Sequence, residues 1–300
     1  MKYKIIAHFM AIFCVLVWGT TFLSTKVLLK SFDPVSIIIY RITICVILLF
    51  IFSPKIYRLK NKIHELYFLG AGASGIAFYF ILENMALKYT NASNVGVVVS
   101  MAPMFTMLFC SIILRTQRIR FNFIIGFFVA IFGIVLISYN GSKSFGLSPK
   151  GDILAVLAMI CWGIYSVFVT IINSLEYYGV GSTRKIMYYG LICLIPFIFI
   201  MKADFNVKAL GEFKNIMNIL YLGVLASTFC FLFWNYSIKV LGPISSSIYL
   251  YLSPAITMIA SNLILKEQIN GLCIIGTILS ILGLIISSDI WAKLRLKKSN

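Results

Sequence analysis

Long apolar runs separated by short polar segments make up almost the whole chain. A helix needs about 20 apolar residues to cross a bilayer, and ten runs come close to this length. The runs are continuous rather than alternating, which predicts helices instead of the strands of a membrane barrel. They cover residues 5–28, 34–52, 66–87, 91–114, 121–138, 151–172, 182–201, 216–238, 243–265 and 271–289. The pattern therefore predicts an all-α integral membrane protein with ten transmembrane helices.

The second half of the chain repeats landmarks of the first half. A shift of 151 positions superposes six pairs of residues: Asn84 and Asn235, Lys88 and Lys239, Pro103 and Pro254, Thr106 and Thr257, Met107 and Met258, and Gln117 and Gln268. Further landmarks recur in the same order, namely Trp18-Gly19 as Trp162-Gly163 and Arg41 as Arg184. Internal repeats of this size are a signature of membrane transporters.

The repeat divides the chain into four parts. Residues 1–140 form a first repeat of five spans, 141–150 a linker loop, 151–290 a second repeat of five spans, and 291–300 a basic tail. Because five is an odd number, the two copies cross the membrane in opposite directions. Inverted repeats place a binding site at mid-membrane and let each half gate one side. We therefore expect two inverted five-helix repeats around a central cavity.

Composition and charge support this interpretation. The chain is 61% hydrophobic and 12% charged, whereas about a quarter of the residues of a soluble domain are charged. The net charge is +17, but the basic residues lie in short loops, which is typical of topology signals and not of a nucleic-acid surface. Sixteen Lys and Arg residues fall on one side and nine on the other. This bias predicts a cytoplasmic-membrane protein with both termini in the cytoplasm.

No motif of the sequence indicates catalysis or a cofactor. The seven cysteines all lie in apolar runs without a CxxC pair, so we interpret them as small buried residues and predict neither disulfides nor a metal site. The chain lacks a P-loop, an HExxH motif and a nucleophile elbow. We therefore expect a protein that is not an enzyme, with no catalytic residues and no cofactor.

Two of the four tryptophans lie deep within predicted spans. Trp18 and Trp162 each fall about a dozen residues into a span and each precede a glycine. One interpretation is close helix packing at the glycine, with the indole filling the adjoining space. The other is that the two rings line the central cavity, and both can hold. The predicted substrate-binding residues are Trp18, Thr21, Tyr79, Trp162, Tyr165, Tyr249 and Ser253.

Pro103 and Pro254 lie near the middle of spans four and nine. Each proline lacks a backbone donor and frees the carbonyl four residues earlier. In lipid such a break is tolerated where protein, a hydroxyl or a water-filled cavity satisfies the freed carbonyl. The prolines therefore predict a kink in each helix, either as a purely structural feature or where the helix lines the cavity and flexes.

Arg41 and Glu83 are charged residues inside predicted spans. Arg41 lies seven residues after Pro34, which is roughly 10 Å below the outer surface of the membrane at 1.5 Å per helical residue. Glu83 is expected at a similar depth. An unpaired charge at this depth costs a few kcal/mol, so each needs a partner or a wet cavity. The open interpretations are an ion pair with a structural or gating role, contact with a charged substrate, and snorkelling to the surface. Asn84 and Asn235 join this gating group, with interhelical hydrogen bonds as the alternative.

Taken together, these landmarks resemble the EamA family of the drug/metabolite transporter superfamily. The resemblance rests on the ten spans, Trp-Gly early in spans one and six, Arg41, the residues Ala-Leu-Lys-Tyr-Thr-Asn-Ala-Ser at 86–93, the two prolines, and Lys-Glu-Gln-Ile at 266–269. It implies a secondary permease with two inverted five-helix repeats and a central cavity, a kind of protein that often exports amino acids or related metabolites.

The sequence departs from this family in two ways. Where members often carry a glutamate after the proline helix of both copies, the first copy has Thr116 and only the second keeps Glu267. Small multidrug relatives use an acidic residue in the first span to couple cations to protons, and this first span has none. The second departure disfavours antiport of cationic drugs.

The leading hypothesis is a permease that exports an amino acid by alternating access. The alternative within transport is an importer or exchanger of a nucleoside-like metabolite such as S-adenosylmethionine. An intramembrane enzyme or a sensor subunit is disfavoured, because no span holds clustered acids, bases or nucleophiles and no soluble output domain is present. The expected partners are a small-molecule metabolite and the lipid bilayer, without nucleic acid. The spacings Gly126/Gly133 and Gly276/Gly283 fit internal helix packing as well as dimer contacts, so a monomer and a homodimer are both open.

Overall fold

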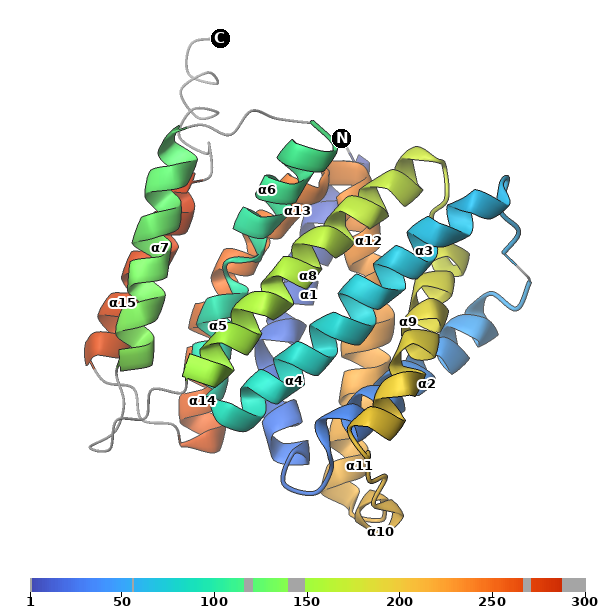
Figure 1. Cartoon of the computed structure of the whole chain (residues 1–300), viewed down its shortest axis with the longest axis horizontal. Helices are drawn as coiled ribbons and strands as arrows, with labels where there is room; N and C mark the ends of the chain where they lie inside the picture. Colours follow the sequence, from blue (N-terminus) through green and yellow to red (C-terminus); the bar gives the residue numbers. More distant parts are fainter. Residues whose placement is uncertain (1, 56, 116–120, 140–148, 267–270, 288–300) are drawn as a thin grey trace.

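The protein is a bundle of helices that run side by side (Figure 1). The computed structural model describes residues 2–55, 57–115, 121–139, 149–266 and 271–287, and every secondary-structure element among them is helical. The first half holds α1 (Lys2–Leu28), α2 (Pro34–Phe52), η1 (Lys62–His64), α3 (Glu65–Gly72), η2 (Ala73–Phe78), α4 (Tyr79–Tyr89), α5 (Ala92–Val99), α6 (Ala102–Ile113) and α7 (Phe121–Tyr139). The second half holds α8 (Pro149–Ser174), α9 (Val180–Ile200), α10 (Val207–Leu210), α11 (Phe213–Leu220), η3 (Tyr221–Phe229), α12 (Cys230–Leu241), α13 (Pro243–Ser247), η4 (Ile248–Leu252), α14 (Ser253–Leu265) and α15 (Gly271–Ser287).

Eight helical stretches among the described residues are long and apolar enough to cross a membrane: Lys2–Leu28, Pro34–Phe52, Lys62–Tyr89, Ala92–Ile113, Pro149–Ser174, Val180–Ile200, Phe213–Leu241 and Pro243–Leu265. Two shorter apolar helices, Phe121–Gly133 and Ile274–Gly283, lie within α7 and α15. Large apolar side chains such as Phe9, Phe128 and Leu263 are exposed on the outside of the bundle. Outward apolar surface of this kind suits contact with lipid tails. The prediction of an all-α membrane protein is therefore confirmed.

Several of these stretches contain irregular helical turns. A π-helical segment, η2, separates α3 from α4, and a second one, η3, separates α11 from α12. The stretch Ala92–Ile113 is interrupted between α5 and α6, and a 3₁₀ segment, η4, precedes α14. Such turns leave carbonyls without the usual helical partner and often occur at functional sites. They are concentrated in helices that surround the interior of the bundle.

The helices α7 and α15 form a closely packed pair at one edge of the bundle (Figure 1). A Cβ added to Gly133 would lie 2.5 Å from the carbonyl oxygen of Gly276 and 2.5 Å from the backbone nitrogen of Ser280, so the two backbones touch there. The Ser280 hydroxyl also donates to the carbonyl of Ala130 at 3.4 Å. Small residues allow this close approach between membrane helices.

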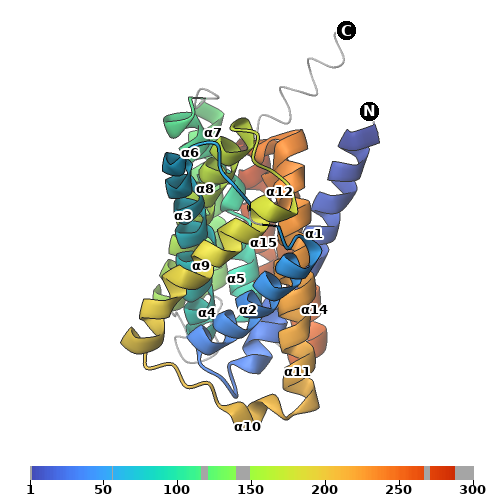
Figure 2. The same cartoon turned by 90° about the vertical axis from the view of Figure 1, so that its right-hand side faces the viewer.

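Connecting segments of the two halves bind each other at both ends of the bundle. Figure 2 shows α10 at one end, with α2 and α9 crossing side by side above it. Near α10, the backbone N–H of Asp204 donates to Asp33 Oδ2 at 2.8 Å. Near the end of α8, Lys60 Nζ pairs with Glu176 Oε2 at 2.5 Å, and this hydrogen bond lowers the pKa of the exposed Glu176 carboxyl. Both ends are thus tied by contacts between distant parts of the sequence.

Candidate functional site

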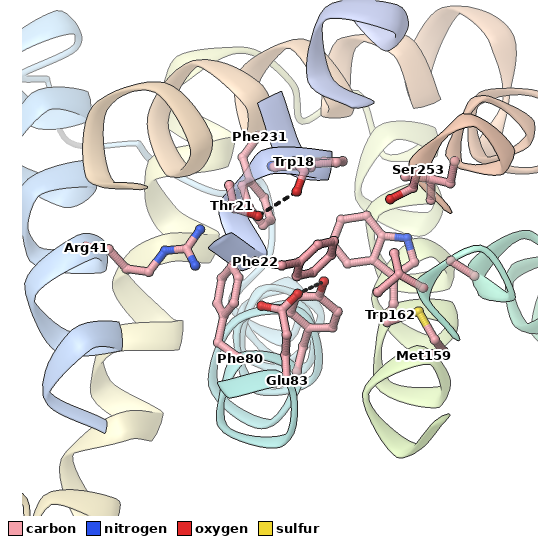
Figure 3. Close-up of a pocket in the computed structure, with 14 residues that line it drawn as sticks. Trp18, Thr21, Phe22, Arg41, Phe80, Glu83, Met159, Trp162, Phe231 and Ser253 are labelled. Atoms are coloured by element: carbon pink, nitrogen blue, oxygen red, sulfur yellow. Dashed lines mark hydrogen bonds between the residues drawn. The ribbon is translucent and has the colours of Figure 1, made fainter. Parts of the chain in front are cut away.

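A cavity lies between the two halves of the chain, and Figure 3 shows the side chains that line it. Its lining residues come from α1, α2, α4, α5, α6, α8, α12, η4 and α14: Trp18, Thr21, Phe22, Arg41, Tyr79, Phe80, Glu83, Val99, Ala102, Met159, Trp162, Phe231, Leu250 and Ser253. The cavity is narrow, since the centre of a water molecule can move through only about 20 Å³ of it. That space holds about one water molecule, so side chains must move before a metabolite can enter.

Arg41 points into this cavity from α2 (Figure 3). The side chain is 2% exposed, its Nε donates to Ser227 Oγ at 2.9 Å, and its guanidinium carbon lies 4.0 Å from the centre of the Phe80 ring. The Nη atoms make no hydrogen bond within the part of the chain that the structure describes. A buried guanidinium without an anionic partner is costly in a membrane interior. Its free edge is therefore available to an anionic group in the cavity.

Glu83 enters the same cavity from α4 and is 4% exposed. Its Oε1 accepts a hydrogen bond of 2.7 Å from the hydroxyl of Tyr79, which lies one turn earlier on the same helix. The ion pair that the sequence suggested between Arg41 and Glu83 is not formed: across the described residues, the two side chains do not come within ion-pair distance. The guanidinium instead binds Ser227 through Nε and stacks on the Phe80 ring. The cavity thus holds two opposite, separate charges.

Aromatic rings make up much of the cavity lining, among them Trp18 and Trp162. The ring centres of Trp18 and Trp162 lie 5.4 Å apart with an angle of 87° between the planes, and Trp234 packs on Trp18 at 5.0 Å. Trp18 Nε1 donates to the carbonyl of Ala226 at 3.0 Å, which fixes the indole against η3. Edge-to-face contacts of this kind are favourable and hold rings in defined orientations.

The glycine after each cavity tryptophan is a packing site, as one of the two interpretations predicted. A Cβ on Gly19 would lie 2.6 Å from Ile256 Cγ2, and one on Gly163 would lie 2.8 Å from the backbone carbonyl carbon of Phe105. Trp18 and Trp162 also line the cavity. Both interpretations of the Trp-Gly pairs therefore agree with the structure.

Two predicted substrate-binding tyrosines lie outside the cavity wall. Tyr165 is fully buried behind Trp162, with ring centres 5.2 Å apart, and its hydroxyl donates to Asn235 Oδ1 at 2.7 Å. Tyr249 instead forms a hydrogen bond of 2.5 Å with His8 Nδ1. Because η4 is a 3₁₀ helix with three residues per turn, Leu250 and Ser253 share the face toward the cavity while Tyr249 faces elsewhere. Thr21, Tyr79 and Ser253 do line it.

Asn84 and Asn235 bind the first turns of neighbouring helices instead of lining the cavity. Asn84 Nδ2 donates to the Pro34 carbonyl at 3.1 Å, at the start of α2. Asn235 Nδ2 donates to Thr183 Oγ1 at 3.1 Å, near the start of α9. The two asparagines therefore have equivalent helix-fixing contacts, which agrees with interhelical hydrogen bonding.

Both prolines lie at the start of a new helix within an interrupted span. Pro103 is in the first turn of α6, and Pro254 is in the first turn of α14. The carbonyl of Leu250 accepts the backbone N–H of Ser253, and the Ser100 hydroxyl donates to the Val97 carbonyl at 2.5 Å. Local groups thus satisfy carbonyls near the breaks. Ala102 and Ser253, each just before its proline, line the cavity.

Sequence reasoning missed the contribution of η3 to the site. Ser227 holds the Arg41 side chain, Ala226 accepts the Trp18 indole, and Phe231 lines the cavity just beyond η3. The sequence 221–229 contains no proline or charge that marks a π-helix. Arg184, the counterpart of Arg41 in the sequence, binds the Ser53 and Lys55 carbonyls at one end of the bundle instead.

The described residues hold no group of three or more His, Cys, Asp or Glu side chains that could bind a metal ion. Their six described cysteines are free thiols, while the side chain of Cys273 lies outside the described residues. Thr116 and Glu267, which occupy the equivalent position in the two copies, also lie outside them. The polar chemistry of the cavity is therefore that of Arg41, Glu83 and their neighbours.

Comparison with known proteins identifies the family of the chain. Residues 5–139 and 149–289 match the EamA-like transporter family. An uncharacterized transporter of Archaeoglobus fulgidus is 25% identical over 288 residues, covering 94% of this chain and 96% of that protein. A probable terminal-alkyne amino-acid exporter of Streptantibioticus cattleyicolor is 25% identical over 273 residues, covering 91% of this chain and 90% of that protein.

A solved crystal structure shares the fold, with a TM-score of 0.64 at 17% identity, over 96% of this chain and 98% of that one. The family match covers almost all of the chain and confirms the resemblance drawn from the Trp-Gly pairs, Arg41 and the prolines. The relatives are named as transporters. This multi-pass membrane protein belongs to the EamA-like transporter family.

Proposed function

We propose that this transporter is a secondary permease that exports an amino acid by alternating access. The observation that carries the proposal is the pair of separate charges in the cavity. Arg41 and Glu83 are both buried, both line the cavity and do not pair with each other. The α-carboxylate and α-ammonium groups of an amino acid carry the complementary charges. A bound amino acid would therefore supply the partner that each buried charge lacks.

The neighbouring groups suit the two ends of such a zwitterion. A planar guanidinium binds a carboxylate through two parallel hydrogen bonds, and the Nη atoms of Arg41 are available for them. Tyr79, whose hydroxyl binds Glu83, and Trp162 line the cavity with their ring centres 5.2 Å apart, and a cation within about 6 Å of a ring centre is attracted to it. We therefore assign the carboxylate to Arg41 and the ammonium to Glu83. The name of the Streptantibioticus relative favours the same class of substrate.

We infer that the fold comprises ten spans in two inverted repeats, with α7 and α15 as spans five and ten. Each half contains a π-helical segment in its third span, a proline-initiated helix in its fourth and one member of the α7–α15 pair at its end. Asn84 and Asn235 fix the starts of α2 and α9 in the same way. Inverted repeats allow the two halves to rock about a central site, and the narrow cavity requires such a rearrangement.

The same proposal includes orientation and direction. The excess of Lys and Arg on one side favours cytoplasmic termini in the cell membrane. Contacts at the cytoplasmic end would break so that substrate enters from the cytoplasm and binds between Arg41 and Trp162. These contacts would then form again before the substrate leaves on the other side. Those contacts include the Lys60–Glu176 pair. The opposite end, near α10, would then open.

Counterflow in proteoliposomes tests this function. Purified full-length protein is reconstituted, the vesicles are loaded with an unlabelled compound, and entry of the same radiolabelled compound is followed with and without a pH gradient. The panel contains the common amino acids and S-adenosylmethionine. We expect saturable counterflow of at least one amino acid, absent from protein-free vesicles.

Other outcomes would contradict the proposal. Counterflow of S-adenosylmethionine alone would favour the nucleoside-like alternative. A lack of flux for the whole panel, in vesicles whose protein elutes as a single folded species, would remove the assignment of an amino acid as substrate. A measured flux that proceeds only inward under physiological gradients would contradict export.

Ser227 is expected to act as a positioning residue for Arg41. Replacing Ser227 by alanine removes the 2.9 Å hydrogen bond to Arg41 Nε, a bond to a charged group that contributes about 1.5–3 kcal/mol. We expect amino-acid affinity to fall about tenfold in Ser227→Ala, while Ser227→Thr retains most of it because the hydroxyl is kept. Binding to purified protein measures this, and equal affinities in the wild type and the alanine variant would contradict the role.

A further inference from the structure

Two hydrogen-bond donors lie at the end of the cavity away from Arg41. Figure 3 shows Trp162 and Ser253 at this end, with Arg41 and Phe80 at the other. Trp162 is 4% exposed and lines the cavity, and its Nε1 is buried without a hydrogen-bond partner. Ser253 is 2% exposed and lines the cavity too, and its hydroxyl makes no hydrogen bond to any described residue.

The other cavity tryptophan provides the contrast. Trp18 Nε1 is occupied, because it donates to the Ala226 carbonyl at 3.0 Å. Buried N–H groups in folded proteins nearly always have a partner, since leaving one unsatisfied costs its full desolvation free energy. The indole N–H is a donor only, and the serine hydroxyl can also donate. Two unused donors at one end of a cavity are suited to an oxygen acceptor.

We propose that Trp162 and Ser253 bind an oxygen atom in the side chain of the transported amino acid. This inference rests on the proposed function, in which the α-carboxylate lies at Arg41 and the α-ammonium at Glu83. With the head group held there, the side chain extends toward Trp162 and Ser253. The permease then selects amino acids with a hydroxyl or carbonyl oxygen in the side chain over hydrocarbon ones of the same shape.

Matched pairs of amino acids test the selection. L-homoserine and L-norvaline differ by a hydroxyl in place of a methyl group, and L-asparagine and L-leucine have side chains of similar shape. The dissociation constant of each is measured with the purified full-length protein by isothermal titration calorimetry. We expect the oxygen-bearing member of at least one pair to bind about tenfold more tightly or better, because a hydrocarbon leaves the buried donors unsatisfied.

Three variants test which residues cause the preference for a side-chain oxygen. In Trp162→Phe, which keeps an aromatic face but loses the N–H, the preference is expected to fall to about threefold or less. Ser253→Ala is also expected to reduce the preference for the oxygen-bearing amino acid. This substitution changes the size of the side chain less than Trp162→Phe does. Trp18→Phe is the matched control: its N–H already binds Ala226, so both members of a pair should weaken by the same factor. Thermal unfolding of each variant checks that it is folded.

The outcomes separate this inference from the proposed function. Tight binding of amino acids without a preference within either pair would overturn the oxygen site and leave the amino-acid permease intact. A preference that survives in both Trp162→Phe and Ser253→Ala would also overturn it. If no member of either pair binds to folded wild-type protein, the proposed function and this inference fail together.

Discussion

Replacing Arg41 by glutamine is expected to reduce amino-acid affinity at least 100-fold and to abolish transport. The guanidinium is buried in the cavity with free Nη atoms. Two charge-assisted hydrogen bonds to a carboxylate contribute about 1.5–3 kcal/mol each, and every 1.4 kcal/mol corresponds to a tenfold change in affinity. Calorimetric titration of the purified variant with the best wild-type substrate measures the loss.

The same change should not destabilise the folded protein. Arg41 has no ion-pair partner among the described residues, so its removal relieves the cost of burying a charge. This relief offsets the loss of the contacts with Ser227 and Phe80, so the melting temperature of Arg41→Gln should stay close to that of the wild type. This combination of lost binding and kept stability distinguishes a binding residue from a structural one.

Two controls sharpen the test. An amino-acid amide, which lacks the carboxylate, should bind the wild type weakly and should lose nothing further in Arg41→Gln. Arg184→Gln removes the sequence counterpart of Arg41, which holds loop carbonyls at one end of the bundle, and should leave substrate affinity unchanged. Full affinity in Arg41→Gln, or an equal loss in Arg184→Gln, would contradict the assignment of the carboxylate.

Gly163→Ala is expected to lower the melting temperature by roughly 5 °C or more. The new Cβ would lie 2.8 Å from the backbone carbonyl carbon of Phe105 and 2.9 Å from its oxygen. Backbone atoms cannot turn aside as a side chain can, so α8 and α6 must separate. Overpacking of this kind costs about 1–3 kcal/mol, and 1 kcal/mol shifts the melting temperature of a domain of 150–250 residues by about 2–4 °C.

Gly271→Ala provides the matched control. A Cβ at Gly271 meets no atom within 4 Å, and this residue does not need a positive φ. Its melting temperature should stay within about 1 °C of the wild type, as is usual for surface changes. Thermal unfolding followed by fluorescence-detected size exclusion compares the two variants. Equal stability of Gly163→Ala and the wild type would show that α8 and α6 can separate freely.

The sequence predicted the helices well because the bilayer leaves few alternatives. In lipid every backbone polar group must be satisfied within a helix or a closed barrel, so an apolar run of sufficient length fixes a helix almost by itself. The run predicted at 34–52 is α2 (Pro34–Phe52), and that at 243–265 coincides with Pro243–Leu265. The breaks near Pro103 and Pro254 were also predictable, because proline cannot donate its backbone nitrogen.

Some of the cavity residues could be found by their type and depth. Trp18, Trp162 and the charges of Arg41 and Glu83 are unusual inside a membrane, and all four line the cavity. Their partners could not be found in this way. Whether Arg41 meets Glu83 or Ser227 depends on the rotation of separate helices, which sequence spacing does not specify. For this reason the sequence left the ion pair as one of three open interpretations, and the structure shows Arg41 bound to Ser227 without an ion pair to Glu83.

The sequence alone thus determined the class of the protein, the bounds of its helices and the charged and aromatic residues at their centres, since the cost of placing polar groups in lipid acts on each segment separately. Only the tertiary structure decided which side chains face the cavity. In the tertiary structure Tyr249 binds His8, whereas Leu250 lines the cavity. Ser227 binds Arg41, and the donors of Trp162 and Ser253 have no partner among the described residues. These outcomes depend on irregular helical turns and on contacts between the two halves, which no local pattern encodes.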